Sequence, residues 1–136
     1  MTGAIVAGIA VVLALAFGLY RRLTDGRARD LAGTDRLTPG DLGADLGPHA
    51  TFVQFSTAVC APCRGTRALL GTIAGAVAGV VHVDVDAESR LELVDRFDVT
   101  RTPTVLVLDG TGTVRHRIVG APRKAEVLEV LEGLAA

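Results

Sequence analysis

The segment from Thr51 to Cys63 reads TFVQFSTAVCAPC and joins an apolar run to a pair of cysteines. Its first part, Thr51 to Phe55, is rich in β-branched and aromatic residues, which is typical of a buried strand. Beyond the cysteines, apolar residues recur at helical spacing at Leu69, Leu70, Ile73 and Val77. The sequence therefore predicts a strand that leads into the cysteine pair, and a helix that begins at the pair and runs to about Ala78.

Further strand and helix patterns lie on both sides of this unit. Thr38 and Pro39 have the residue types of a helix cap and of a first helical position, so a short helix is expected to about Leu46. After the unit we expect a strand at 80–85, a helix at 91–97, a hairpin of strands at 104–108 and 113–119, and a closing helix around 127–134. This order predicts an α/β fold, a mixed central sheet with helices on both faces.

The N-terminal stretch from Thr2 to Tyr20 contains no charged residue. As a helix that rises ~1.5 Å per residue it would be about 28 Å long, close to the ~30 Å hydrocarbon core of a bilayer. Tyr20 suits the membrane interface, and Arg21 and Arg22 end the apolar run. A cleaved signal peptide is the alternative, but the start of the chain lacks the Lys or Arg that normally precedes the apolar run of such peptides. Residues 2–20 are therefore expected to form a retained, single transmembrane helix.

Residues 21–36 are polar, contain glycine and show no apolar period, which indicates a juxtamembrane linker before a domain at 37–136. Arginines follow the span at positions 21, 22, 27 and 29, whereas only the α-amino group precedes it. The positive-inside rule then places the domain in the cytoplasm, with an extracytoplasmic domain as the alternative. The formal net charge of −1 gives no reason to expect a nucleic-acid partner.

Cys60 and Cys63 are the two cysteines of the chain, so no other pairing competes. Positions three apart at the start of a helix are neighbours on one face, which lets the two sulfurs bridge. Free backbone N–H groups and the helix dipole favour negative charge there, so the pKa of the first thiol is expected below its free value of ~8.5. A zinc site would need four ligands, and the sequence has neither a second CxxC nor a CxxH, so no metal and no other cofactor is expected.

A Cys-x-x-Cys motif that follows a buried strand and opens a helix resembles the active site of the thioredoxin superfamily. The resemblance covers residue 37 to the C-terminus and includes Pro62 inside the pair, Thr102-Pro103 ahead of a strand, and Gly120 after the hairpin. It implies thiol–disulfide exchange, with Cys60 as the exposed nucleophile and Cys63 as the buried resolving thiol.

The resemblance also implies roles for the residues around the cysteines. The bond between Thr102 and Pro103 is expected to be cis, with Pro103 packed near the cysteine pair. The backbone of Thr102 is expected to pair with an extended substrate segment. Ala61 and Pro62 are expected to support the active site from within the pair.

Several positions depart from the residues usual in the family. Val59 stands where many thioredoxins have Trp, and Ala61 replaces the usual Gly. Gln54 occupies the place of the family's buried Asp, and His82 aligns with a buried Lys near it. Because an amide cannot relay a proton as a carboxylate does, the rate and redox potential are not expected to match those of a general cytosolic thioredoxin.

Other polar residues near the motif have plainer interpretations. Arg64 and Arg67 would lie where they can stabilise a thiolate, but a solvated helix face is favoured. His82 is expected to be a strand histidine with a satisfied ring rather than a proton carrier. Asp84 and Asp86 alternate along one predicted strand and are expected to be solvated carboxylates rather than metal ligands.

These features predict an enzyme, a membrane-tethered thiol–disulfide oxidoreductase that acts on protein disulfides. In the cytoplasm it would act as a reductant and draw electrons from a reductase or a low-molecular-weight thiol. The alternative is a binding module, in which the fold holds a membrane partner and the cysteine pair is a redox-sensitive latch. Disulfide reduction that depends on Cys60 distinguishes the two hypotheses.

Overall fold

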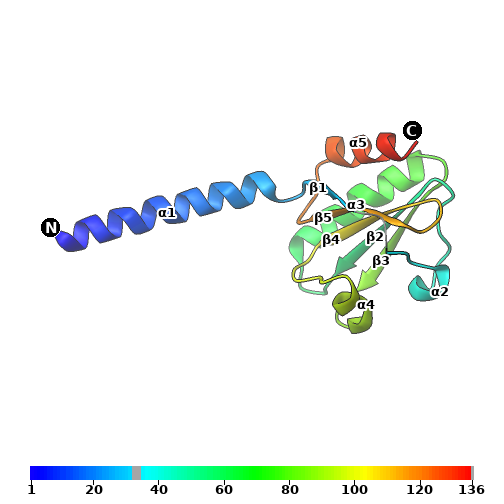
Figure 1. The fold of residues 1–136 in the computed structure, drawn as a ribbon, viewed down its shortest axis with the longest axis horizontal. Helices are drawn as coiled ribbons and strands as arrows, with labels where there is room; N and C mark the ends of the chain where they lie inside the picture. Colours follow the sequence, from blue (N-terminus) through cyan, green and yellow to red (C-terminus); the bar gives the residue numbers. More distant parts are fainter. Residues whose placement is uncertain (32–34, 136) are drawn as a thin grey trace.

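Figure 1 shows the computed structural model, which describes residues 1–31 and 35–135. A mixed sheet lies at the centre of the domain, with its strands in the order β1-β5-β4-β2-β3. The strands are β1 (Ala28–Asp30), β2 (Ala50–Ser56), β3 (Val80–Asp86), β4 (Thr104–Asp109) and β5 (Val114–Val119). The helices are α1 (Thr2–Thr24), α2 (Pro39–Leu42), α3 (Ala61–Ala76), α4 (Leu91–Arg96) and α5 (Lys124–Ala135). In Figure 1, α3 and α5 cover one face of the sheet, and α2 and α4 lie on the other.

The core is built on both faces of β2, all of whose residues are buried. Val53 and Phe55 belong to a cluster with side chains of α2 and α4, whereas Phe52 belongs to a cluster with side chains of α3 and α5. This alternation is the period of two that a strand shows when both its faces are covered. Phe52 and Phe55 are fully buried, and each such side chain contributes about 1.5–3 kcal/mol by leaving water.

The element order predicted from the sequence is confirmed, with differences at the ends of elements. Thr38 caps α2 as expected: its Oγ1 accepts from the Asp41 N–H at 3.2 Å, and Asp41 Oδ2 accepts from the Thr38 N–H at 2.8 Å. The expected end of this helix near Leu46 is wrong. Gly43 adopts a left-handed conformation with φ of 66°, which ends α2 after Leu42.

α1 contains the whole uncharged run and extends past Arg21 and Arg22 to Thr24. It ends there because Asp25 is extended and Gly26 has a φ of 77°. None of its residues is buried, and it is long and apolar enough to cross a membrane. Figure 1 shows it projecting from the domain as a single rod.

Part of the segment expected to be a linker forms a strand. β1 pairs antiparallel with β5, with Arg29 opposite Arg117. This pairing uses backbone groups along the edge of β5, which explains why the sequence shows no apolar period there. Residues 32–34 of the expected linker lie outside the described residues.

Asp109, which begins the β4–β5 turn, accepts hydrogen bonds from Thr111, Thr113 and Arg115. Burial raises the pKa of this carboxyl, but the hydrogen bonds outweigh burial and lower the pKa to about 2. Because the folded pKa lies below the unfolded value of ~3.9, the stabilisation is complete above ~3.9 and is lost as the pH falls toward the folded value.

We expect Asp109→Ala to lower the free energy of unfolding by about 2 kcal/mol at pH 7, and by clearly less at pH 3. Urea unfolding of the chain from Asp25 onward measures this, because α1 contributes no buried side chain. Asp45→Ala, at an exposed position after α2, is the control and should change stability by less than about 0.5 kcal/mol. A loss for Asp109→Ala that is as large at pH 3 as at pH 7 would contradict the prediction.

Candidate functional site

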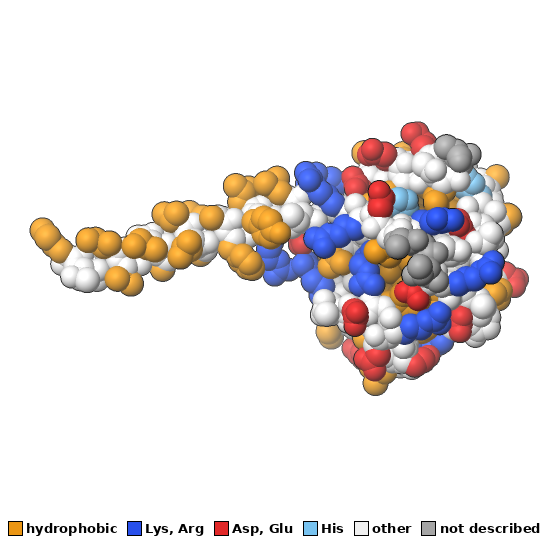
Figure 2. Space-filling model, viewed as in Figure 1, with side chains coloured by type: hydrophobic (Ala, Val, Ile, Leu, Met, Phe, Trp, Pro, Cys, Tyr) orange, Lys and Arg blue, Asp and Glu red, His pale blue; other side chains and the backbone are white. Residues whose placement is uncertain are grey.

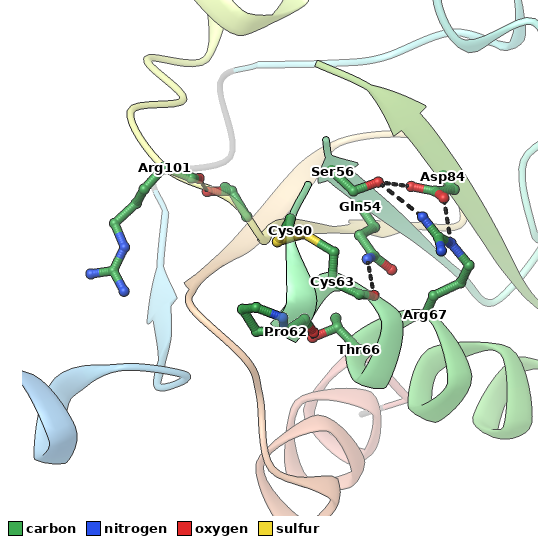
Figure 3. Close-up of a disulfide and its surroundings, with 10 residues drawn as sticks. Gln54, Ser56, Cys60, Pro62, Cys63, Thr66, Arg67, Asp84 and Arg101 are labelled. Carbon is green, nitrogen blue, oxygen red and sulfur yellow. Dashed lines mark hydrogen bonds and ion pairs between the residues drawn. A yellow bond between two sulfur atoms is a disulfide. The ribbon is translucent and has the colours of Figure 1, made fainter. Parts of the chain in front are cut away.

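The cysteine pair lies beyond the carboxyl end of β2, where the chain turns into α3 (Figure 3). Cys60 is the N-cap residue of α3, and Cys63 lies in its first turn. The two form a disulfide, with the sulfurs 2.07 Å and the Cα atoms 5.3 Å apart. Cys63 is 1% exposed, whereas Cys60 is only partly buried. A molecule that approaches from solvent therefore reaches Cys60 first.

The start of α3 provides the surroundings of the pair. Ala61 and Pro62 are exposed between the two cysteines, and Pro62 stands in the first turn, where its missing N–H costs no helical hydrogen bond. The Pro62 carbonyl accepts from the Thr66 hydroxyl at 3.0 Å. In the reduced state, the free N–H groups of this turn and the helix dipole favour negative charge on the sulfur of Cys60. The arrangement can therefore present a thiolate at the surface, with a second thiol behind it.

The loop ahead of β4 reaches the same edge of the sheet. The peptide bond between Thr102 and Pro103 is cis, as the resemblance to thioredoxins implied. Thr104, the next residue, pairs with Phe55 of β2, so the loop lies beside the segment that leads to Cys60. Pro103 is buried and Thr102 is partly exposed. The topology thus brings Thr102 and Pro103 to the edge that carries the cysteine pair.

Gln54 is fully buried, and its amide is hydrogen-bonded at both ends. Its Nε2 donates to the Cys63 carbonyl at 3.0 Å, which leaves Oε1 facing His82 Nε2 at 2.9 Å. Because Oε1 can only accept, His82 must carry a proton on Nε2. Burial lowers the pKa of His82 below its ordinary value of 6.5. His82 is therefore a neutral strand histidine with a hydrogen-bonded ring, as favoured from the sequence.

Arg67 extends toward β3 and away from the disulfide (Figure 3). Its Nε lies 2.6 Å from Asp84 Oδ2, and Asp84 also accepts from the Ser56 hydroxyl. Asp84 is therefore ion-paired with Arg67, and the expectation that it is simply solvated is wrong. Within residues 1–31 and 35–135, no three His, Cys, Asp or Glu side chains come together as a metal site requires.

Sequence reasoning did not single out Arg101, which immediately precedes the Thr102–Pro103 bond. Its Nη1 and Nη2 donate to Asp25 Oδ1 and Oδ2 at 3.1 and 2.8 Å. The hydrogen bonds from Arg101 outweigh the effect of burial and lower the pKa of Asp25. The two residues are 76 positions apart, and no local pattern links them, so the contact emerges only in the folded chain.

Comparison with known proteins identifies the family of the domain. Residues 46–135, more than half of the chain, match the family model described as a thioredoxin-like domain. The chain belongs to the thioredoxin superfamily. Its thioredoxin-like domain contains the cysteine pair and the Thr102–Pro103 loop, whereas α1 and β1 precede the matched residues.

Known thioredoxins resemble the chain in sequence and in structure. Thioredoxin H5 of Oryza sativa subsp. japonica is 34% identical over 89 residues, which are 64% of this chain and 65% of that protein, so the chain spans slightly less than two thirds of it. A mutant thioredoxin from Halobacterium salinarum NRC-1 superposes with a TM-score of 0.60 at 18% identity, over 71% of this chain and 81% of that one. Oxidized mitochondrial thioredoxin 3 from Saccharomyces cerevisiae gives 0.55 at 20% identity, over 62% and 78%. At such identities the two solved structures show the fold alone.

The fold and the cysteine pair together bear on the chemistry. A thioredoxin-like fold whose two cysteines lie at disulfide distance supports thiol–disulfide oxidoreductase activity in general. Gln54 and His82 occupy the positions that the resemblance assigned to a buried Asp and Lys, and they contact each other there. In this chain the buried support of Cys63 is therefore a neutral amide.

We expect Gln54→Leu to lower the free energy of unfolding by about 2 kcal/mol, because it leaves the partly buried ring N–H of His82 without its acceptor. Adding His82→Phe should recover part of that loss, since both polar partners are then gone. Urea unfolding of the chain from Asp25 onward measures both. Thr72→Val on the exposed face of α3 is the control, with an expected change below about 0.5 kcal/mol. A double variant that recovers none of the loss caused by Gln54→Leu would contradict the assigned contact.

Proposed function

We propose that this protein is a membrane-tethered thiol–disulfide oxidoreductase that uses Cys60 and Cys63 to reduce protein disulfides. The observation that carries the proposal is the arrangement of the pair at the start of α3. Cys60, which is partly exposed, is bonded to Cys63, which is 1% exposed, and the cis-proline loop reaches the same edge of the sheet. Such an arrangement suits a nucleophile at the surface and a resolving thiol beneath it.

The proposed reaction begins with the reduced domain. The Cys60 thiolate attacks one sulfur of a substrate disulfide, a Cys60–substrate bond forms, and the other substrate sulfur leaves as a thiolate and takes up a proton. Cys63 then loses its proton and attacks the Cys60 sulfur. This closes the Cys60–Cys63 disulfide and releases the second substrate sulfur, so that two electrons have passed from the domain to the substrate.

Neighbouring backbone would orient the substrate in this reaction. An extended substrate segment would pair with the backbone of Thr102, and Ala61, Pro62 and Pro103 would form the surface against which it rests. The oxidised domain would be returned to the dithiol form by a reductase or by a low-molecular-weight thiol.

α1 would tether the domain to a membrane as a single span. Its composition supports this role: residues 2–20 are uncharged, and arginines follow at once. Those arginines favour a cytoplasmic domain, in which the pair would act as a reductant; the alternative is an extracytoplasmic domain.

Insulin reduction tests the chemistry. We expect the full chain in detergent micelles to accelerate the reduction of insulin by dithiothreitol, and Cys60→Ser to lose at least about a hundredfold of that acceleration. Thr72→Ala, a small change at an exposed position of α3, should leave the rate unchanged. Equal rates for the wild type and Cys60→Ser would reject catalysis and favour the binding-module hypothesis.

A second readout of the same proteins tests the roles of the two thiols. In the reduced chain, iodoacetamide should modify Cys60 much faster than Cys63, because only Cys60 is accessible and lies at the helix cap. Mass spectrometry of each cysteine-containing peptide at neutral pH gives both rates. Equal rates would remove the basis for calling Cys60 the nucleophile.

The orientation is tested with reporters fused after Ala136. A reporter that is active only in the cytoplasm should be active, and an export-dependent reporter at the same site should be silent. Arg21→Glu together with Arg22→Glu should weaken the preference, whereas Arg123→Glu, far along the chain in the domain, should not. An active export-dependent reporter on the wild-type chain would reverse the assignment.

A further inference from the structure

The end of α1 and the cysteine pair meet at one edge of the sheet. Phe55 pairs with Thr104, and Thr104 pairs with Val119, so the ends of β2 and β5 flank the start of β4. Cys60 follows β2 at this edge. The Gly26 N–H donates to the Val119 carbonyl at 2.8 Å, which brings the end of α1 to the same place. The apolar helix therefore leaves the domain at the edge that carries the reactive sulfurs.

The connection between α1 and the domain is short and closely packed. Residues 25–27 alone separate α1 from β1. Gly26 has a φ of +77°, and a Cβ there would lie 2.3 Å from the Ala121 carbonyl oxygen. A Cβ on Gly120, across the contact, would lie 3.1 Å from Asp25 Cβ. Backbone packed this closely leaves little room for the domain to swing about α1.

The Asp25–Arg101 ion pair ties this connection to the loop of the cysteine site. It has two parallel hydrogen bonds, at 3.1 and 2.8 Å, and each side chain is only 35% exposed. A bidentate, partly buried pair holds its geometry better than a single contact between exposed charges. Figure 3 shows the Arg101 side chain extending from the loop near the disulfide toward the end of α1.

The surface at this edge suits a membrane interface. In Figure 2, basic side chains gather at the neck between α1 and the domain, where anionic lipid headgroups would attract them. A cavity of about 440 Å³ at this neck is lined by Tyr20 and by Arg21, Arg27, Arg29 and Arg101, among others. Beside Cys60, Val59 is 92% exposed and Ala61 and Pro62 are exposed, so the rim of the reactive sulfur is apolar.

We propose that the Cys60–Cys63 pair exchanges disulfides with an integral membrane protein whose own disulfide lies at the membrane surface. This rests on the proposed function and adds to it the class of substrate. Thr24 lies about 6 Å beyond Tyr20 along the helix, which is within the headgroup layer, so the reactive edge faces the bilayer. Asp25 and Arg101 are positioning residues that hold it there.

The exchange itself is the two-step reaction described above. The reduced domain supplies both electrons, one disulfide of the membrane protein is opened to two thiols, and the Cys60–Cys63 disulfide closes. A single turnover therefore needs no further reductant once the domain has been reduced.

Two transmembrane peptides test the proposal. Each carries one disulfide-closed loop, placed either about three residues or, on a Gly/Ser spacer, about thirty residues outside the span. The reduced full chain is incorporated with either peptide into nanodiscs of phosphatidylcholine and phosphatidylglycerol, and thiol release is followed over a single turnover. We expect the near disulfide to react at least about tenfold faster than the far one.

Variants of the chain then test whether a preference for the near disulfide comes from a fixed orientation of the domain or from its attachment to the membrane alone. Asp25→Ala, or ten Gly/Ser residues inserted after Thr24, should bring the ratio of near to far rates toward one. Glu92→Ala, which removes the exposed Arg90–Glu92 ion pair, should leave the ratio unchanged. All of these proteins should reduce the small soluble disulfide dithiobis-nitrobenzoate at equal rates, which shows that the cysteine site is intact.

Each outcome has a distinct meaning. Equal rates for the near and far peptides with the wild-type chain, while insulin is still reduced, would overturn this inference and leave the proposed function standing. A preference for the near peptide that survives both the Asp25→Ala change and the insertion would overturn the positioning role. If insulin is not reduced either, the proposed function itself is wrong.

The depth of the Cys60 edge of the sheet relative to the lipid headgroups can be measured without any disulfide exchange. A bimane label is attached in a Cys60→Ser, Cys63→Ser chain at Val59→Cys or, as the matched position at the opposite edge, at Thr111→Cys. Nitroxide on lipid headgroups should quench the label at position 59 several times more strongly than the label at position 111. Equal quenching would place the two edges at the same height and overturn the inference.

Discussion

Thr104 is paired on both sides, with Phe55 of β2 and with Val119 of β5. This register decides which strand ends share an edge, so the cysteine pair, the cis-proline loop and the end of α1 owe their proximity to it. The core protects the register, because a slip of one residue in β2 would carry Phe55 and Gln54 to the wrong faces of the sheet. Packing of side chains on the two faces of β2 thus positions the cysteine pair that follows the end of this strand.

Gln54 connects that strand directly to the second cysteine. It is fully buried, donates to the Cys63 carbonyl and faces the ring of His82, which burial keeps neutral. A carboxylate at this position could take up the proton that Cys63 loses, whereas an amide cannot. The support that Gln54 provides is therefore positional, and in the proposed reaction the proton from Cys63 would pass to another acceptor.

Short, closely packed contacts hold the end of α1 against the edge of the sheet that carries the cysteine pair. A flexible linker would only raise the concentration of the domain near the membrane, with the gain set by its length. If α1 spans a membrane as proposed, residues 25–27, the packing of Gly26 and Gly120, and the Asp25–Arg101 pair would also fix the direction in which the domain faces. For an oxidoreductase of the proposed kind, a fixed orientation of the domain would favour substrate disulfides at one height above the bilayer over those at other heights.

Local patterns in the sequence were enough to predict the α/β order, the uncharged helix, the cysteine pair between a strand and a helix, and the capped start of α2. Each of these depends on residues within a few positions of one another, where apolar period and capping chemistry act. The early end of α2 at Gly43 and the pairing of β1 with β5 were not predicted, because a left-handed glycine and an edge strand leave little trace in apolar periodicity. The resemblance to thioredoxins placed His82 near Gln54, but only the tertiary structure showed the hydrogen bond between them. Only the tertiary structure decided that Asp25 meets Arg101, since these partners are 76 positions apart and the fold of the sheet brings them together.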